Sequence, residues 1–361
     1  MNEINRVLDV IIIGAGQAGL ASAWQLQQHG LNILILDEQK RPGGNWRNYY
    51  DSLELFSPAS YSSLPGLAFP GTPGHYPARD EVVLYLEDYA ARFRLPIRQN
   101  TRVTQVQQSG HGFELWSADG QLFRAKALIV ASGAFSRPYI PAIPGLDGFR
   151  GNSLHSAEYQ NVERFRGQRV VVIGAANSAV QIAYELAKVA DTTLATREAI
   201  RFVPQRILGI DFHAWLKWTG LEKTRWLSDQ STPVLDDGTY RKALKAGQLQ
   251  RKPMFTTVSP TGVVWADGRS EAIDSLVFAT GFRPNIPFLA GLPLLDDQGQ
   301  VLQHQGLARH VPGLFFVGLP RQRNFASATL RGVGPDVAHL VPHVLRHLEM
   351  PLPVSIALPR R

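Results

Sequence analysis

The segment IIIGAGQAG (11–19) constrains the fold of this chain more than any other feature. It joins a short apolar run at 8–13, which fits a buried parallel strand, to a stretch with helical spacing at 17–29. A second apolar run at 31–36 follows the helical stretch. This order of strand, glycine-containing turn, helix and strand predicts a βαβ unit of the kind that binds dinucleotides.

A second segment, VVIGAANSA (171–179), repeats the same order with fewer glycines. It joins an apolar run at 169–173 to a helical pattern at 177–189, and a further run at 192–195 follows. One chain with two such units is expected to bind two nucleotides. We therefore predict an α/β fold with two dinucleotide-binding, Rossmann-like domains.

The glycines of the first turn each have a separate role in the expected chemistry. Gly14 makes the tight turn, Gly16 lets a pyrophosphate approach the backbone, and Gly19 lets the helix lie close to the strand. The helix N-terminus then faces the phosphates. Asp37 ends the following strand, where a carboxylate can accept a hydrogen bond from a ribose 2′-hydroxyl and leaves no room for a 2′-phosphate. A tight glycine turn without a ligand is the alternative.

The second turn is a weaker version of the first. Gly174 keeps the turn, but Ala176 and Ala179 replace the second and third glycines. The methyl group of Ala176 is expected to point where a pyrophosphate would approach, so binding should be weakened and not abolished. A weakly held nucleotide suits a nicotinamide cofactor that exchanges during turnover. A duplicated fold that has lost its ligand is the alternative.

The residues after the second unit bear on which nicotinamide cofactor is used. Arg197 and Glu198 take the place that Asp37 has in the first unit. An arginine can pair with a 2′-phosphate, whereas a glutamate repels the phosphate and accepts from a free 2′-hydroxyl. The two side chains therefore oppose each other, and both NADPH and NADH are expected as cofactors. A solvated charge pair at a strand end is the alternative.

Composition removes several classes of function. The 361 residues include no cysteine, which excludes disulfide scaffolds, thiolate metal sites and dithiol redox chemistry. The net charge of +7 comes from dispersed basic residues, so nucleic-acid binding is not expected. The N-terminus lacks the pattern of a secretion signal or a membrane span. We expect a cytoplasmic enzyme without a metal site, and a homodimer is left open.

The rest of the chain is less regular. Three segments alternate or run apolar, as in a small antiparallel sheet: 101–108, 112–117 and 121–130. A stretch rich in proline and glycine at 137–148 indicates a domain boundary. No fold can be predicted for 200–255, where aromatic and basic residues mix. The segment 327–348 predicts a helix or helix pair, broken or kinked at Pro335 and Pro342.

Five segments resemble, in order, the sequence markers of flavin-containing monooxygenases and their Baeyer–Villiger relatives. They are GGNW (43–46), LFSPASYSSLPG (55–66), ASGAFSRPYIPAIPG (131–145), FRGNSLHSAEY (149–159) and FATGFRPN (278–285). The segment 55–66 is most similar to the short bacterial members. By spacing alone, GGNW is equally a loop with a core aromatic residue. The resemblance implies FAD in the first unit and a nicotinamide nucleotide in the second. The implied domains are an FAD domain at 1–147 and 284–361, with an NAD(P)H domain inserted at 148–283.

The resemblance also implies site residues. Four side chains are candidates for catalytic roles: Ser57, His155, Tyr159 and Asn324. Besides the residues already discussed, the cofactor-binding candidates are Gly44, Trp46, Val103, Ser132, Gly133, Asn177, Ser178, Thr280, Gly281, Gly318, Ala328 and Thr329. Many family members have a flavin-facing asparagine in the segment matching LFSPAS, and this chain has Phe56, Ser57 and Pro58 there. Asn324 is a substitute for that amide or a local backbone cap.

The implied activity uses NAD(P)H to reduce FAD, forms a flavin hydroperoxide with dioxygen, and oxygenates a small sulfide or amine, or a ketone. Three alternatives share some of these features. A disulfide reductase is excluded because it needs cysteines. An NAD(P)H oxidase or flavin reductase is kept open by the missing asparagine, and a non-catalytic flavoprotein that senses redox state remains a third reading.

Overall fold

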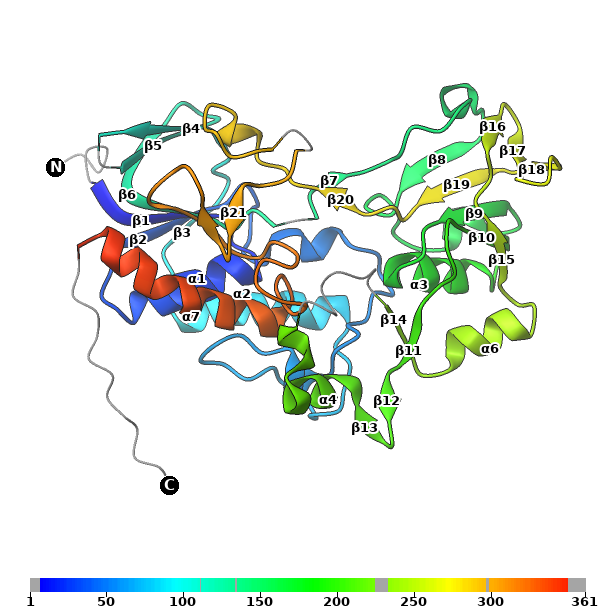
Figure 1. Ribbon diagram of the computed structural model, residues 1–361, viewed down its shortest axis with the longest axis horizontal. Helices are drawn as coiled ribbons and strands as arrows, with labels where there is room; N and C mark the ends of the chain where they lie inside the picture. The colour runs from blue at the N-terminus through cyan, green and yellow to red at the C-terminus, as the bar shows by residue number, and fades with distance from the viewer. Residues whose placement is uncertain (1–6, 111, 134, 225–232, 297–298, 350–361) are drawn as a thin grey trace.

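The computed structural model describes residues 7–349, except 111, 134, 225–232 and 297–298. It has two sheets side by side, each with its own helices (Figure 1). The first sheet has nine strands and the second has five. The predicted α/β fold with two dinucleotide-binding units is confirmed.

The first sheet is built around five parallel strands. In order across the sheet these are β23 (Leu314–Phe316), β6 (Leu122–Val130), β1 (Val7–Ile13), β2 (Ile33–Leu36) and β3 (Ile97–Arg98). Four strands extend it with antiparallel pairing: β4 (Val103–Ser109), β5 (Gly112–Ser117), β21 (Gln303–His304) and β22 (Leu307–Ala308). The central strand β1 is buried from Val10 to Ile13, which explains the apolar run there.

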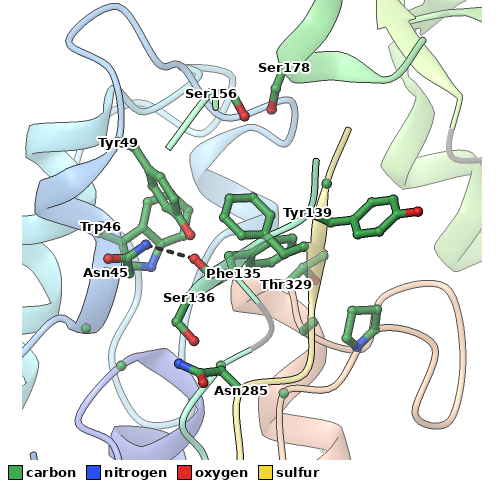
Figure 2. Close-up of a pocket in the computed structure, with 18 of the residues that line it drawn as sticks. Asn45, Trp46, Tyr49, Phe135, Ser136, Tyr139, Ser156, Ser178, Asn285 and Thr329 are labelled. Atoms are coloured by element: carbon green, nitrogen blue, oxygen red, sulfur yellow. Dashed lines mark hydrogen bonds between the residues drawn. The ribbon is translucent and has the colours of Figure 1, made fainter. Parts of the chain in front are cut away.

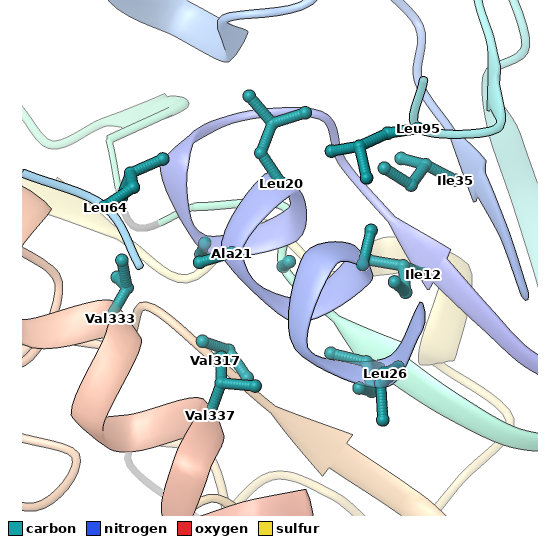
Figure 3. Packing of buried hydrophobic residues seen from close by; sticks show 14 of the residues in the cluster. Ile12, Leu20, Ala21, Leu26, Ile35, Leu64, Leu95, Val317, Val333 and Val337 are labelled. Atoms are coloured by element: carbon teal, nitrogen blue, oxygen red, sulfur yellow. The ribbon is translucent and has the colours of Figure 1, made fainter. Parts of the chain in front are cut away.

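Three helices cover one face of this sheet: α1 (Gln17–Gln27), α2 (Arg79–Arg92) and α7 (Leu330–His347). Side chains from both ends of the chain belong to this core, which contains Leu20, Ala21 and Leu26 of α1 together with Val333 and Val337 of α7 (Figure 3). The C-terminal helix therefore shares a core with the first unit, and the insertion of one domain into the other stays a prediction.

Helix α7 corrects one prediction. It runs without interruption from Leu330 to His347, so Pro335 and Pro342 do not break it, and the alternative of a kink at these prolines stays a prediction. The helix also begins at Leu330, three residues after the predicted start at 327. A proline inside a helix costs about 3 kcal/mol. The helix buries seven large apolar side chains, and each contributes about 1.5–3 kcal/mol, so burial outweighs the two prolines.

The second sheet is parallel throughout. Its order is β15 (Gln250–Pro253), β10 (Asp191–Thr196), β9 (Arg169–Ile173), β19 (Ser275–Phe278) and β8 (Asn152–His155). Helices α3 (Asn177–Leu186) and α6 (Thr239–Lys245) lie against it, and three short antiparallel strands join its far side: β16 (Thr257–Ser259), β17 (Gly262–Val264) and β18 (Ser270–Ala272). The second predicted βαβ unit is therefore β9, α3 and β10.

The chain passes between the sheets twice. The outward passage contains β7 (Arg137–Pro138) and the return contains β20 (Phe282–Arg283), and these two strands pair antiparallel. The crossings lie near the predicted domain limits at 147 and 283. Those limits remain predictions. All strands of the first sheet lie before residue 147 or after residue 283, and all strands of the second sheet lie between these residues.

The segment at 200–255 forms several short elements. These are β11 (Phe202–Pro204), β12 (Arg206–Ile207), β13 (Ile210–Asp211), α4 (Phe212–Thr219) and β14 (Val234–Asp236), before α6 and β15. Helix α4 leaves the second sheet and lies close to α7 of the first unit (Figure 1). There the hydroxyl of Tyr76 donates to Asp211 at 2.6 Å, and Arg331 pairs with Glu222. The insertion thus covers part of the unit into which it is inserted.

None of the helices in the described ranges combines the length and apolar character needed to cross a membrane.

Candidate dinucleotide and active site

One cavity of about 1160 Å³ receives both dinucleotide turns. Gly14 and Gly16 line it from the first unit, and Gly174 and Ala176 line it from the second. Cavities for a single drug-sized ligand are about 300–1,000 Å³, so this cavity exceeds the space that one such ligand needs. Both turns therefore open into one chamber.

The first turn has the shape that a pyrophosphate requires. Gly14 has a φ of +105°, and a Cβ there would lie 2.5 Å from the carbonyl oxygen of Ala131. A Cβ on Gly16 would meet nothing closer than Gly44 Cα at 3.8 Å, so the backbone is open on its cavity side. Helix α1 begins at the next residue and brings its free N–H groups to the same place. These residues fit the FAD pyrophosphate.

Asp37 is fixed in position before any ligand binds. Its carboxylate accepts hydrogen bonds from the backbone N–H of Ala15 at 2.5 Å and of Gln39 at 2.7 Å. Burial raises the pKa of Asp37, and the two N–H donors oppose that increase. The residue lines the cavity, so its remaining lone pairs fit the hydroxyl groups of a ribose.

The second turn has the same backbone arrangement as the first, with an alanine in place of the second glycine. Gly174 has a φ of +146°, and Ala176 is the N-cap of α3 with extended backbone. The amide of Asn177 is held by protein contacts, since Nδ2 donates to Pro233 O and Oδ1 accepts from Leu235 N, both at 3.3 Å. Asn177 therefore ties the turn to the neighbouring backbone, and it also lines the cavity.

Arg197 and Glu198 are both exposed and line the cavity just after β10. Arg251 supports this turn from the neighbouring strand β15. Its Nε donates to Thr196 Oγ1 at 2.8 Å, and its terminal nitrogen donates to the carbonyl of Glu198 at 3.0 Å. Sequence reasoning missed Arg251, because its pairing depends on parallel strands that are far apart in the chain.

The structure brings most of the predicted cofactor-binding residues to this one cavity. Besides those already described, the following line it: Gly44, Trp46, Val103, Ser132, Gly133, Ser178, Thr280, Gly281, Gly318, Ala328 and Thr329. Gly19 is behind the wall, where a Cβ would lie 1.8 Å from Gly14 O. The roles of these residues in binding remain predictions.

His155 and Tyr159, predicted as catalytic, are fully buried and away from the cavity wall. The Nε2 of His155 lies 2.9 Å from Gly281 O in the return linker, and Nδ1 accepts from Ala157 N at 3.1 Å. Burial lowers the pKa of His155, which agrees with a neutral ring donating through Nε2. Tyr159 donates to Glu185 Oε2 at 3.1 Å. These contacts support positioning roles and give no contact with a substrate.

The other two predicted catalytic residues also have local partners. Ser57 lines the cavity, and its hydroxyl lies 3.0 Å from the hydroxyl of Ser62. The side chain of Asn324 accepts from the backbone N–H of Ala326 at 2.8 Å, which is the local cap that sequence left open. Asn324 is behind the residues that line the cavity, so the structure gives no support for its role near the flavin.

Several residues on the cavity wall were not predicted. Asn45 donates to the carbonyl of Phe135 at 3.0 Å, and Tyr49 and Asn285 lie around the same space as the predicted Trp46 (Figure 2). Gln17 also lines the cavity and contacts two of its walls. Gln17 was within reach of sequence reasoning, because the first residue of the helix after a dinucleotide turn must lie beside the ligand.

An α/β chain whose two dinucleotide turns line one cavity is a two-nucleotide oxidoreductase. A family model described as pyridine nucleotide-disulphide oxidoreductase matches residues 11–318, and the chain belongs to this family. Because the chain has no cysteine, the disulfide chemistry in the family's name is excluded for it.

The proteins similar to this chain include monooxygenases and an uncharacterized oxidoreductase. The solved flavin-containing monooxygenase from Stenotrophomonas maltophilia is 36% identical with a TM-score of 0.85, covering 95% of this chain and 99% of that one. An uncharacterized CzcO-like oxidoreductase of Geobacillus kaustophilus is 34% identical over 95% of this chain and its own full length. A probable indole-3-pyruvate monooxygenase of Arabidopsis thaliana is 31% identical over 88% of this chain and 86% of its own. The predicted resemblance to bacterial flavin-containing monooxygenases is confirmed.

Proposed function

We propose that this chain is an FAD-dependent monooxygenase that uses NADPH or NADH and dioxygen to oxygenate small organic sulfides or amines. Ketones, by oxygen insertion, are a further substrate class. The observation that carries this proposal is the single cavity lined by both turns, since hydride transfer requires the nicotinamide and the flavin to meet. The similarity to a flavin-containing monooxygenase and to a probable indole-3-pyruvate monooxygenase supports the same reaction class.

Separate groups of residues would bind the two cofactors. Gly14, Gly16 and Asp37 would hold FAD, and Gly174 with Arg197 would hold the nicotinamide nucleotide. FAD supplies hydride acceptance and dioxygen activation. The protein supplies position and a chamber that excludes water.

An NAD(P)H oxidase is the second candidate, and one observation favours it. The segment where many relatives have an asparagine offers only Phe56, Ser57 and Pro58, and the Ser57 hydroxyl already has Ser62 as a partner. Fewer free hydrogen-bond donors near the flavin would favour release of hydrogen peroxide over oxygen transfer.

One experiment separates the two. Purified protein is supplied with NADPH or NADH and a panel of sulfides, amines and ketones, and the oxygenated product and hydrogen peroxide are both measured. A monooxygenase forms product in an amount that approaches the cofactor consumed with at least one substrate. Peroxide equal to the cofactor consumed with every substrate would establish the oxidase instead.

A further inference from the structure

The side-chain amide of Gln17 joins two separate walls of the cavity. Its Oε1 accepts from Trp46 Nε1 at 2.7 Å, and its Nε2 donates to the carbonyl of Ala328 at 3.1 Å. An indole nitrogen can only donate and a backbone carbonyl can only accept, so the amide has one orientation that satisfies both partners. Gln17, Trp46 and Ala328 all line the cavity.

Ala328 has a backbone conformation that needs support. Its φ is +74°, in the left-handed region where a residue with a Cβ is strained. Such residues keep this conformation when the surrounding structure holds them. The loop that contains Ala328 leads directly into α7 and lies on the side of the cavity formed by the first unit. The hydrogen bond from Gln17 reaches the carbonyl of the strained residue itself.

We propose that Gln17 is a positioning residue that holds the strained Ala328 peptide against bound FAD. Trp46 fixes the amide of Gln17, which gives the tryptophan of GGNW a role that spacing alone does not explain. This inference rests on the proposed function, because it requires FAD in the first unit. It assigns no direct chemistry to Gln17, which acts through the position of another residue.

Another glutamine of helix α1, Gln25, provides a matched control. Gln25 of α1 donates through Nε2 to the carbonyl of Gly334 in α7 at 2.8 Å. Gln25 lines a separate small hollow with Trp24 and Pro65, away from the main cavity. Gln17 and Gln25 therefore make the same kind of bond between α1 and the C-terminal segment, and one of them faces the FAD site.

The test compares Gln17→Leu with Gln25→Leu in the full chain. FAD is titrated into apoprotein to obtain the dissociation constant by fluorescence, and the flavin absorption spectrum and thermal midpoint are recorded. We expect Gln17→Leu to raise the FAD dissociation constant about tenfold and to shift the flavin absorption bands, since it removes two half-buried hydrogen bonds whose net contribution is of that order. Gln25→Leu should lower the midpoint similarly and leave both flavin properties unchanged.

A second variant tests the mechanism. Ala328→Gly relieves the strain at φ +74°, so Gln17→Leu in that background should raise the FAD dissociation constant threefold or less. An unchanged tenfold effect there, equal flavin effects in the two leucine variants, or no effect of Gln17→Leu would each overturn the inference. Failure of the parent protein to bind FAD would overturn the proposed function itself, which distinguishes the two failures.

Discussion

Gly19 lies so close to Gly14 that a Cβ on Gly19 would be 1.8 Å from the Gly14 carbonyl oxygen. In the second unit, Ala179 occupies the equivalent place with its Cβ present, 3.0 Å from where a Cβ on Gly174 would be. The first helix therefore approaches its turn more closely than the second. The missing glycine at 179 reflects this wider spacing in the second unit.

Because of this difference, we expect a change of side-chain size to affect FAD content at position 19 and not at position 179. Gly19→Ala should push α1 away from its turn, lower the FAD content, and reduce the free energy of unfolding by about 1–3 kcal/mol. Ala179→Gly should cost about 1–2 kcal/mol, from helix propensity and the lost burial of one methyl group, and should leave the FAD content unchanged. Thermal unfolding and flavin absorbance of the purified variants provide the measurement. Equal losses of FAD content in both variants would contradict the difference in spacing.

Substitution of Ala176 by glycine is expected to increase the affinity for the nicotinamide cofactor. Ala176→Gly should strengthen nicotinamide binding by roughly 0.5–1.5 kcal/mol, because it removes the methyl group that faces the pyrophosphate. FAD content should stay the same. The dissociation constant is measured by stopped-flow flavin reduction, with Ala179→Gly as the control that alters helix contacts only. Unchanged affinity would mean that the turn already holds the cofactor away from residue 176.

Asp37 should make FAD binding dependent on pH. The ionised carboxylate accepts from the ribose, and burial raises its pKa above 3.8, so FAD affinity should fall during acidification at a higher pH than for an exposed aspartate. Asp37→Ala should lose on the order of 1–3 kcal/mol of FAD binding at neutral pH. FAD titrations across pH check both points, and Asp37→Asn should bind weakly without this pH dependence. Undiminished flavin content in Asp37→Ala would rule out the assignment.

Arg197 and Glu198 should leave the protein able to use both nicotinamide cofactors, within about a tenfold preference. Arg197→Ala should raise the Michaelis constant for NADPH and spare NADH, because the guanidinium pairs with the 2′-phosphate. Steady-state kinetics with each cofactor give the comparison. A similar loss with both cofactors would show that Arg197 does not read the 2′-phosphate.

His155 should link stability to pH. Its pKa in the fold is lowered by burial below 6.5, so the unfolded chain takes up a proton first as pH falls. The stabilising contribution is complete above about pH 6.5 and is lost below it, by up to about 1.4 kcal/mol per pH unit. His155→Gln keeps a donor for Gly281 and does not titrate. Denaturant unfolding from pH 8 to 5 should show a smaller pH slope in this variant than in the parent.

Local patterns predicted the two βαβ units, because a buried parallel strand and the following helix are each specified by a few consecutive residues. The turn glycines and Asp37 were found for the same reason. Helix α7 was predicted only in part. The cost of Pro335 and Pro342 is visible in the sequence, whereas the apolar contacts with α1 that outweigh it depend on residues about 300 positions away.

The site was less predictable where long-range contacts decide it. His155 and Tyr159 have the residue types of catalytic groups, but burial against Gly281 and Glu185 gives them other partners. The position of α4 rests on contacts such as Tyr76 with Asp211. No pattern within 200–255 could indicate that this segment would pack on another unit.

The paired crossings at β7 and β20 bring the two ends of the predicted inserted domain side by side. Arg283 aligns with Arg137 and Phe282 with Pro138, so the two points where the insertion would be cut are hydrogen-bonded neighbours. If this domain were replaced by the corresponding domain of a relative, the two new junctions at β7 and β20 would lie next to each other. The segment that contains α4 belongs to the exchanged part of the chain. Replacing the nicotinamide domain would therefore also replace the residues that contact the first unit there.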